Sequence, residues 1–228
     1  MPQPCDPVSS EIAPGAFLFR RFLSTDVQRG LVEQCRSLID GAVPAYVPTV
    51  RGGGKMHVRM LCLGRHWNGK TYKYEGARTD FDGLAVPPLP DNFRELARAC
   101  AQAAGMPLDA DLCILNLYGR DGRMGLHQDK DESARSIAAG LPVVSISLGD
   151  TAQFLFGGLR RRDAVEVIPL QSGDVFVFGG PSRLRYHGVS RTTPGTAPAE
   201  LSLAGRFNLT FRQYDTASPG LESDARNE

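Results

Sequence analysis

The sequence predicts an α+β chain in which helices buttress one side of a β-sandwich or jelly roll. In the first half, two stretches repeat apolar residues at the helical period, and residues typical of helix ends bound each stretch. Short runs rich in β-branched and aromatic residues follow, and Gly or Pro separates most of them. Two helices followed by a series of strands are typical of this fold class. With 228 residues, the chain is long enough for one substantial domain.

The two ends of the chain differ in composition from its middle. Residues 1–15 are rich in proline and poor in large apolar side chains, which predicts a flexible leader with no signal peptide. Residues 16–214 are expected to form a single domain, which the chain enters through a short strand at Phe17 to Phe19. Residues 215–228 have the composition of a disordered tail.

Two helices are predicted from their apolar stripes and their caps. The first follows Ser24, a favourable N-cap, and its stripe runs from Val27 to Ile39 before Gly41. Asp91 opens the second, which covers residues 92–104 and ends before Gly105.

Residues 44–90, between the two helices, are expected to form a mobile lid with one strand at residues 56–61. Basic side chains dominate this lid: Arg51, Lys55, Arg59, Arg65, Lys70, Lys73 and Arg78. It also carries aromatic rings, among them Trp67 and Tyr72. Cations bind phosphates and rings stack on bases, so the composition suits a nucleic-acid surface. A solvated basic loop with its aromatic residues packed beneath would have the same composition.

The second half is expected to be mostly strand. The β-rich runs are residues 112–118, 143–148, 153–156, 164–170, 174–178 and 206–212. No internal repeat, heptad pattern or low-complexity tract interrupts them.

Composition excludes several classes of protein. A formal charge of +1 excludes a whole-chain polycation, and no apolar run is long enough to span a bilayer. The five cysteines are scattered and never form a C-x-x-C pair, which argues against a disulfide framework and a structural zinc site. These features predict a cytoplasmic protein in a reducing compartment.

A candidate metal site begins at His127 and Asp129. On an extended segment, two residues in this spacing point to the same face, and a second strand alongside could bring His187 to them. Two imidazoles and one carboxylate are the ligand set of non-haem Fe(II) oxygenases. A lone His-x-Asp pair also arises by chance in solvated turns.

Polar residues alternate with apolar ones in the last predicted strand. Arg206, Asn208, Thr210 and Arg212 share one face. Beside a metal, the arginines and the amide would suit a small dicarboxylate, because a guanidinium matches a carboxylate with two hydrogen bonds. An edge strand with its charges in water would alternate in the same way.

As a set, the motifs resemble the AlkB family of Fe(II)- and 2-oxoglutarate-dependent dealkylating dioxygenases, most strongly its bacterial members. The matching runs are residues 115–118, 126–132, 156–159, 173–175, 182–188 and 206–212. The resemblance covers residues 13–213. Phe178 stands where the family often has Trp, and Pro181 and Arg185 also depart from its pattern.

The resemblance implies a double-stranded β-helix core under a nucleotide-recognition lid, and a role for individual residues. The implied Fe(II) ligands are His127, Asp129 and His187. The implied 2-oxoglutarate site contains Asn116, Tyr118, Arg206, Asn208 and Arg212. Trp67, Tyr72, Asp131 and Arg161 would border the flipped base, with Asp131 and Arg161 also catalytic. Arg123 and Lys130 would contact the nucleic-acid backbone.

The resemblance also implies a reaction, oxidative demethylation of alkylated bases such as N1-methyladenine and N3-methylcytosine. The substrates would be single- or double-stranded DNA, and RNA as well. Fe(II) would be the cofactor. O2 and 2-oxoglutarate would be consumed, and formaldehyde, succinate and CO2 would be released. These two lesions are cations, so a carboxylate at Asp131 and the π-faces of the lid would favour them. The enzyme would act as a monomer without a membrane.

Two alternatives remain open from the sequence. An Fe(II) oxygenase of the same fold could act on a protein side chain or a small metabolite, and turnover assays on methylated compounds would distinguish it. A nucleic-acid-binding module that has lost catalysis would not take up iron, although intact His127, Asp129, His187 and Arg206 argue against it.

Overall fold

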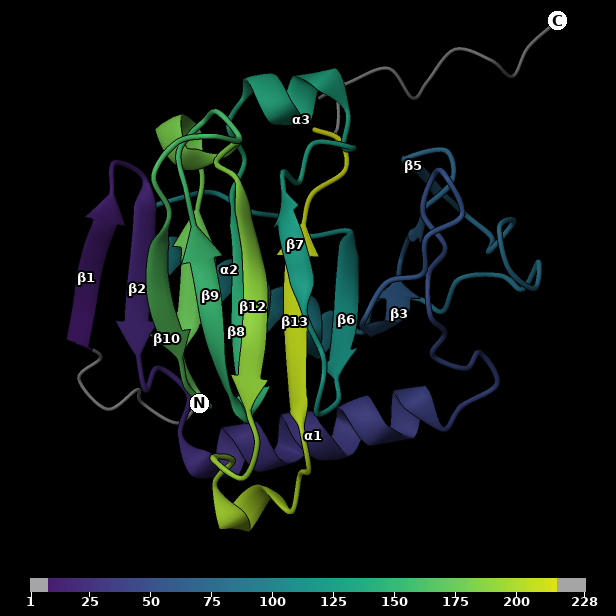
Figure 1. The fold of residues 1–228 in the computed structure, drawn as a ribbon, viewed down its shortest axis with the longest axis horizontal. Helices are drawn as coiled ribbons and strands as arrows, with labels where there is room; N and C mark the ends of the chain where they lie inside the picture. The colour runs from purple at the N-terminus through teal and green to yellow at the C-terminus, as the bar shows by residue number, and fades with distance from the viewer. Residues whose placement is uncertain (1–7, 217–228) are drawn as a thin grey trace, which may run out of the picture.

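The computed structural model describes residues 8–216, which fold into two antiparallel sheets, a small hairpin and flanking helices (Figure 1). The helices are α1 Thr25–Ile39, α2 Asp91–Ala103 and α3 Ala134–Ala138, with 3-10 turns η1 Gly180–Ser182 and η2 Ala199–Leu201. The strands up to the lid are β1 Val8–Ala13, β2 Ala16–Arg20, β3 Arg59–Leu63, β4 His66–Asn68 and β5 Lys73–Glu75. The later strands are β6 Leu112–Tyr118, β7 Met124–His127, β8 Val143–Gly149, β9 Thr151–Phe156, β10 Glu166–Leu170, β11 Val175–Phe178, β12 His187–Thr193 and β13 Arg206–Arg212.

The two sheets lie face to face. The larger has seven strands in the order β1-β2-β11-β8-β13-β6-β3, and the smaller has four in the order β10-β9-β12-β7. Consecutive strands of the chain alternate between the sheets over much of the second half, which is the connectivity of a jelly roll. The fold class expected from the sequence is therefore confirmed.

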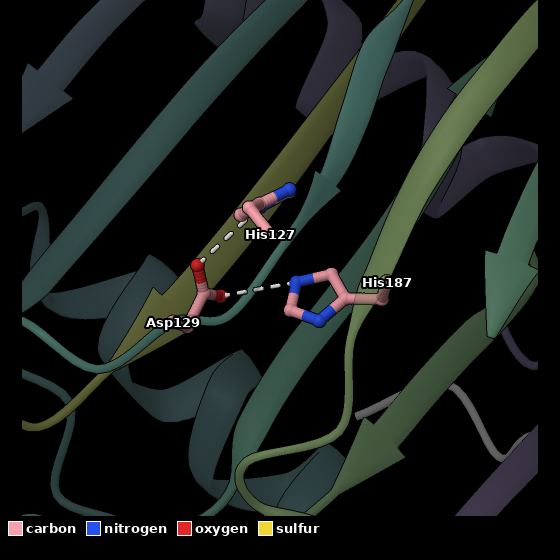
Figure 2. A group of neighbouring side chains, drawn as sticks. All are labelled: His127, Asp129 and His187. Carbon is pink, nitrogen blue, oxygen red and sulfur yellow. Dashed lines mark ion pairs between the residues drawn. The ribbon is translucent and has the colours of Figure 1, made fainter. Parts of the chain in front are cut away.

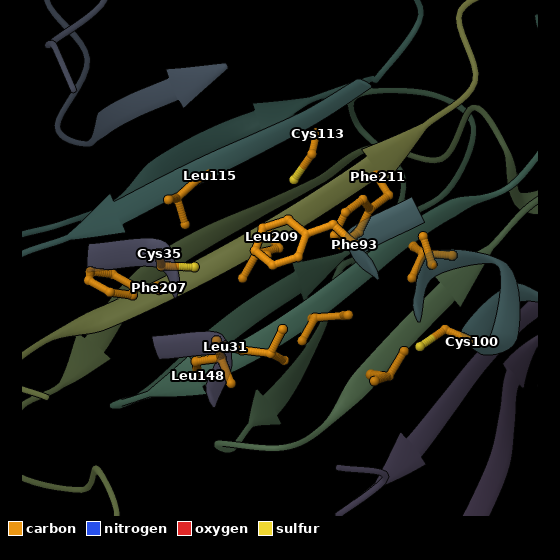
Figure 3. Packing of buried hydrophobic residues seen from close by; sticks show 14 of the residues in the cluster. Leu31, Cys35, Phe93, Cys100, Cys113, Leu115, Leu148, Phe207, Leu209 and Phe211 are labelled. Atoms are coloured by element: carbon orange, nitrogen blue, oxygen red, sulfur yellow. The ribbon is translucent and has the colours of Figure 1, made fainter. Parts of the chain in front are cut away.

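Helices cover the outer face of the larger sheet. Alternate residues of the central strands, such as Leu209 and Phe211, point to this face and pack on Phe93 and Cys100 of α2 and on Leu31 of α1 (Figure 3). Both helices carry their apolar stripes toward the sheet, so burial of these side chains holds the layer together.

The inner face of the larger sheet meets the smaller sheet. Leu18, Ile114 and Phe176 of the larger sheet pack with Phe154 and Phe156 of the smaller one. The aromatic rings contact each other closely, with centroids 5.0 Å apart for Phe156 and Phe176. Ile114 and Phe154 of this second core also line a pocket between the two sheets.

Both predicted helices are confirmed, with small shifts at their ends. Ser24 caps α1 and accepts a hydrogen bond from the Val27 amide, while α1 ends at Ile39 with Asp40 as its cap. Gly105 follows α2 with a positive φ of 69°, the left-handed conformation that favours glycine after a helix. The bounds of β6 and β13 also agree with the prediction.

Two expectations need correction. The flexible leader does not extend over residues 8–13, because β1 pairs along its length with β2; an edge strand needs few large apolar residues. Residues 1–7 and most of the expected tail lie outside the described residues. The lid is also more ordered than expected, since residues 44–90 contain β3, β4 and β5. Within residues 8–216, none of the helices has the length and apolarity needed to cross a membrane.

Candidate active site

The smaller sheet brings the two candidate histidines side by side. β12 runs antiparallel to β7, and His187 is the direct partner of His127 in their register. The two imidazole rings lie with centroids 4.4 Å apart. Asp129 follows β7 by two residues and turns its carboxylate toward both rings (Figure 2). We call His127, Asp129 and His187 the triad.

The atoms of the triad are arranged to hold one metal ion. One ligand atom from each residue lies within 4.8 Å of the other two. Nε2 of each histidine lies 3.6 Å from a carboxylate oxygen of Asp129. Each Nδ1 faces a backbone carbonyl, Gly125 O at 2.9 Å and Arg185 O at 3.0 Å. These contacts keep the proton on Nδ1, so the Nε2 lone pairs point into the centre.

The electrostatics of the triad favour the states that bind metals. Burial and the neighbouring His187 lower the pKa of His127 to about 4, so its imidazole is neutral. Burial alone would raise the pKa of the Asp129 carboxyl, but the Arg212 guanidinium and His187 hold that pKa well below its usual value. Oδ2 of Asp129 is buried without a hydrogen-bond partner, as expected for an atom that awaits a cation.

A chain of buried charges supports Asp129 from the side of β13. Nη1 of Arg212 forms an ion pair with Oδ1 of Asp129 at 2.8 Å, and its Nε lies 3.3 Å from Oε1 of Glu132. Arg183 pairs with Oε2 of Glu132 at 2.8 Å and donates to the backbone carbonyl of Asp129. Sequence reasoning gave no role to Glu132 or Arg183, because neither lies on a periodic face.

Behind the triad, β13 and β6 place polar side chains on the inner face of the larger sheet. Asn208 is the register partner of Asn116, and Arg206 is the partner of Tyr118. β13 lies between β8 and β6, so the alternative of a solvated edge strand is wrong. Its four polar residues all line one pocket with the triad.

Arg206 is the most deeply buried charged side chain of this pocket, with 1% of its surface exposed. Its guanidinium donates to Ser147 Oγ at 2.8 Å and lies farther from two backbone carbonyls, while Nε has no partner. Burial lowers the pKa of Arg206 to about 10. Oδ1 of Asn116 is also buried without a partner. Within residues 8–216, no carboxylate accepts a hydrogen bond from this buried guanidinium, so the site suits an anionic ligand.

The pocket has a volume of about 530 Å³ and opens between the triad and the lid. Trp67, Tyr72, Asp131, Arg161 and Lys130 all line it, as expected for residues that border a base or a backbone. Nε1 of Trp67 donates to Oδ2 of Asp131 at 2.7 Å. Burial, followed by the nearby Glu132 charge, raises the pKa of Asp131, although the Trp67 hydrogen bond opposes this.

Other expected residues lie elsewhere. Arg123 is exposed, does not line the pocket, and contacts Nε2 of His57 at 3.0 Å. Arg78, included among the basic residues of the lid, is only 2% exposed and pairs with Asp82 at 3.0 Å. His66 of the lid is fully buried beside Asp80. Arg78 is therefore not part of an exposed phosphate-binding surface.

Comparison with known families identifies the same chemistry. The profile of the 2OG-Fe(II) oxygenase superfamily matches residues 15–212, which include the triad and β13.

Comparison with individual proteins narrows this result. The chain is 42% identical to the DNA N(6)-methyladenine demethylase ALKBH1C of Arabidopsis thaliana, over 89% of this chain and 49% of the relative. It is 36% identical to the alpha-ketoglutarate-dependent dioxygenase AlkB of Escherichia coli (strain K12), over 91% of this chain and 94% of the relative. The chain thus spans about half the length of the Arabidopsis relative. The expected similarity to bacterial members extends over nearly the whole length of the Escherichia coli relative, whereas the sequence identity is higher to the plant protein.

A solved structure agrees in fold. The structure of OsALKBH1 superposes with a TM-score of 0.84 at 41% sequence identity, covering 90% of this chain and 99% of that one.

Proposed function

The chain belongs to the AlkB family within the 2OG-Fe(II) oxygenase superfamily, and we propose that it oxidatively demethylates alkylated bases in DNA and RNA. Membership of this family implies Fe(II) as the cofactor and 2-oxoglutarate and O2 as cosubstrates. The observation that carries the proposal is the content of one pocket. A metal-binding triad, a buried guanidinium without a carboxylate partner, and an aromatic and acidic rim all line it.

The triad would hold Fe(II) through Nε2 of His127, Nε2 of His187 and a carboxylate oxygen of Asp129. Arg212 already pairs with Oδ1 of Asp129, whereas Oδ2 has no hydrogen-bond partner among the described residues. Ligation through Oδ2 therefore leaves the Arg212 ion pair intact. This donor set, two imidazoles and one carboxylate, fits Fe(II) and leaves coordination positions open.

Arg206 would bind one carboxylate of 2-oxoglutarate at the base of the pocket. Its unpartnered Nε and its adjacent Nη groups can donate two parallel hydrogen bonds, which match a carboxylate. Tyr118 lies beside it in the register, and Asn116 and Asn208 lie between Arg206 and the triad along the strands. Arg212, at the other end of this face, would orient the metal ligand Asp129 rather than act on the cosubstrate alone.

The base would enter between the lid and the triad. Trp67 and Tyr72 offer rings from the lid, and Asp131 offers a carboxylate fixed by the Trp67 indole. A ring and a carboxylate together favour a flat cation, the form of N1-methyladenine and N3-methylcytosine. Arg161 lies at the same mouth and donates to the Leu126 carbonyl at 2.8 Å, so it can border the base while its position is held.

The lid and Lys130 would contact the phosphates of the strand that carries the base. Lys130, Arg51, Lys55, Lys70 and Lys73 are exposed, and their charges can replace the counterions of a nucleic acid. Arg123 could contact the backbone only away from the pocket.

When bound, Fe(II), 2-oxoglutarate and O2 would supply the oxidation of the methyl group, which would be released as formaldehyde while 2-oxoglutarate would be converted to succinate and CO2. The protein binds the cosubstrate, holds the methyl group toward the triad and keeps water out of the apolar parts of the pocket. We further propose that the protein acts as a monomer in the cytoplasm. The cytoplasmic location is supported by four buried cysteines that form no disulfide among residues 8–216.

A panel of methylated oligonucleotides tests the proposal. Single- and double-stranded DNA and RNA would carry N1-methyladenine, N3-methylcytosine or N6-methyladenine, and the enzyme would receive Fe(II), 2-oxoglutarate and ascorbate. Mass spectrometry should show loss of the methyl group and equimolar succinate. N6-methyladenine belongs in the panel because the plant relative is named as its demethylase. Turnover of methylated peptides or metabolites, without turnover of any oligonucleotide, would support the alternative oxygenase.

A further inference from the structure

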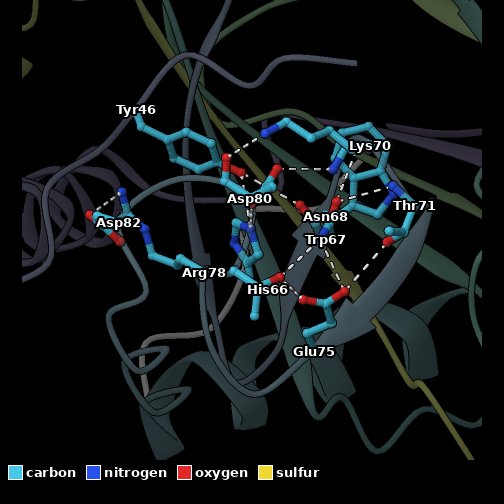
Figure 4. A network of polar contacts seen from close by, with 12 residues as sticks. Tyr46, His66, Trp67, Asn68, Lys70, Thr71, Glu75, Arg78, Asp80 and Asp82 are labelled. Atoms are coloured by element: carbon cyan, nitrogen blue, oxygen red, sulfur yellow. Dashed lines mark hydrogen bonds and ion pairs between the residues drawn. The ribbon is translucent and has the colours of Figure 1, made fainter. Parts of the chain in front are cut away.

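Trp67 is the chain's only tryptophan. On either side of it in the sequence is a residue that contacts the buried carboxylate of Asp80. His66 precedes it on β4, and Gly69 follows it by two residues. Oδ1 of Asp80 lies 2.6 Å from Nε2 of His66, and Oδ2 accepts a hydrogen bond from the Gly69 amide at 3.3 Å (Figure 4). Asp80 therefore fixes the backbone on both sides of the Trp67 ring.

The pair of His66 and Asp80 is sealed from solvent. Their side chains are 0% and 1% exposed, although Asp80 comes from the loop after β5. Neither residue lines the pocket, so neither touches a bound base. A fully buried ionisable pair in a lid needs a structural or positional reason, because desolvation of such groups is costly.

A third segment joins the pair. The Tyr46 hydroxyl lies 3.4 Å from Nε2 of His66 and donates to the Trp67 carbonyl at 3.5 Å. Tyr46 is anchored to β3, since it exchanges backbone hydrogen bonds of 2.9 and 2.7 Å with Met60. The contacts thus tie the β4-β5 hairpin to the larger sheet at the position of Trp67.

At its other end, the Trp67 ring meets the substrate region. Its Nε1 donates to Asp131 at 2.7 Å, and its face or edge lies against Tyr72, with centroids 5.7 Å apart. A rotation of the β4 backbone would break the contact with Asp131. The placement of both substrate-facing groups therefore depends on how β4 is held.

We propose that Asp80 and His66 are positioning residues that set the Trp67 indole, and through it the Asp131 carboxylate, in the geometry that receives the base. The proposal rests on the proposed function for its kinetic part alone. An ionised Asp80 carboxylate can only accept, so it suits the Gly69 amide and the His66 tautomer that carries its proton on Nε2. An asparagine would offer one oxygen and one NH2 group, so Asp80→Asn keeps the shape but removes the charge and replaces one acceptor by a donor.

Because the chain has a single tryptophan, its fluorescence reports this position directly. Asp80→Asn and His66→Phe should shift the Trp67 emission to longer wavelength and increase its quenching by acrylamide. The single variant His66→Gln, which keeps a donor near the position of Nε2, should have a Trp67 emission close to that of the wild type. Asp82→Asn is the matched control, since Asp82 lies on the same loop but pairs with Arg78. Circular dichroism and the melting temperature establish that each variant is folded.

The kinetic arm separates positioning from general damage. In Asp80→Asn, the KM for a methylated oligonucleotide should rise roughly tenfold, because small displacements of binding groups have effects of this size or larger. The KM for 2-oxoglutarate should stay at the wild-type value, since Arg206 lies on β13. The conservative single variant His66→Gln should keep a KM for the methylated oligonucleotide close to the wild-type value.

The outcomes distinguish this inference from the proposed function. Unchanged Trp67 emission and quenching in folded Asp80→Asn and His66→Phe would overturn the inference, whatever the enzyme's substrate. Equal rises in KM for oligonucleotide and 2-oxoglutarate would also overturn it, because they indicate a general loss of structure. A fluorescence change in an enzyme that demethylates no oligonucleotide would instead leave the positioning intact and refute the proposed function.

Discussion

Nη1 of Arg212 lies 2.8 Å from Oδ1 of Asp129, although one residue is on the larger sheet and the other follows the smaller one. Both side chains are nearly buried, with exposures of 5% and 10%. Removing the partner of a buried carboxylate leaves its orientation undefined and its charge uncompensated. The ion pair therefore couples the metal-binding triad to the strand that carries Arg206.

We expect Arg212→Gln to raise the dissociation constant for Mn²⁺, used as an air-stable probe for Fe(II), by about 10–100-fold. The matched control is Arg206→Gln, which alters another buried arginine on the same face of β13 but makes no contact with Asp129. Its Mn²⁺ affinity without 2-oxoglutarate should equal that of the wild type. Calorimetry measures both, and equal losses in the two variants would contradict the assignment.

Replacement of each triad residue should abolish turnover while the protein stays folded. His127→Ala and His187→Ala remove one imidazole each and leave the buried Asp129 carboxylate paired with Arg212. Asp129→Ala is less suitable, because it leaves Arg212 with Glu132 alone and should destabilise the fold by about 3–5 kcal/mol. Asp129→Asn is the better variant. Demethylation at a near-normal rate by any of these variants would remove that residue from the ligand set.

Arg206→Lys should raise the KM for 2-oxoglutarate, since lysine keeps the charge but cannot donate two parallel hydrogen bonds. The ammonium would also have to replace the hydrogen bond that the native guanidinium donates to Ser147 Oγ at 2.8 Å. Steady-state kinetics with varied 2-oxoglutarate measure this effect. A KM equal to wild type would show that the cosubstrate carboxylate binds elsewhere.

Local patterns were sufficient to predict much of the fold. The apolar stripes of α1 and α2, with Ser24 and Gly105 at their ends, gave helices that the structure confirms. The alternation in β13 placed Arg206 and Arg212 on one face, where both line the pocket. These predictions succeed because helix and strand periods are properties of short segments.

Long-range pairing could not be predicted in the same way. β1 has too few apolar residues to be recognised, and only its pairing with β2 defines it. β7 ends at His127, so strand alternation does not place Asp131 in the pocket. The contact from Trp67 to Asp131 and the burial of Arg78 depend on the folded lid. Neither the contact nor the burial can be predicted from the sequence of one segment.

Salt dependence tests whether the lid binds phosphates. Each contact from an exposed residue such as Lys55, Lys70, Lys73 or Lys130 should contribute about −0.7 to the slope of log K against log salt on single strands. Lys73→Gln should make the slope shallower by about one such contribution if Lys73 contacts a phosphate. Arg78→Gln would not report on phosphates, since Arg78 is buried against Tyr46 and Asp82. A slope near zero for the wild type would count against a nucleic-acid substrate.

The last prediction is that Asp131 selects cationic over neutral lesions. Its carboxylate lines the pocket beside the triad, and the Trp67 indole holds one of its oxygens at 2.7 Å. Asp131→Asn keeps the shape and an acceptor for the indole but removes the charge opposite the base. A charge-assisted contact contributes about 1.5–3 kcal/mol, so kcat/KM should fall roughly tenfold or more on N1-methyladenine and N3-methylcytosine.

Neutral lesions provide the internal comparison for Asp131→Asn. N6-methyladenine shares its ring with N1-methyladenine but carries no fixed charge, and N3-methylthymine is the neutral counterpart of N3-methylcytosine. Since neither gains a charge-assisted contact from Asp131, the loss of kcat/KM on them should be smaller. All four bases would be measured in one oligonucleotide sequence, with Gln128→Ala as a control from the same segment whose side chain donates to the Leu184 carbonyl. Equal losses on cationic and neutral bases would show that Asp131 does not read charge, and that its bond to Trp67 instead serves to place the lid against the triad.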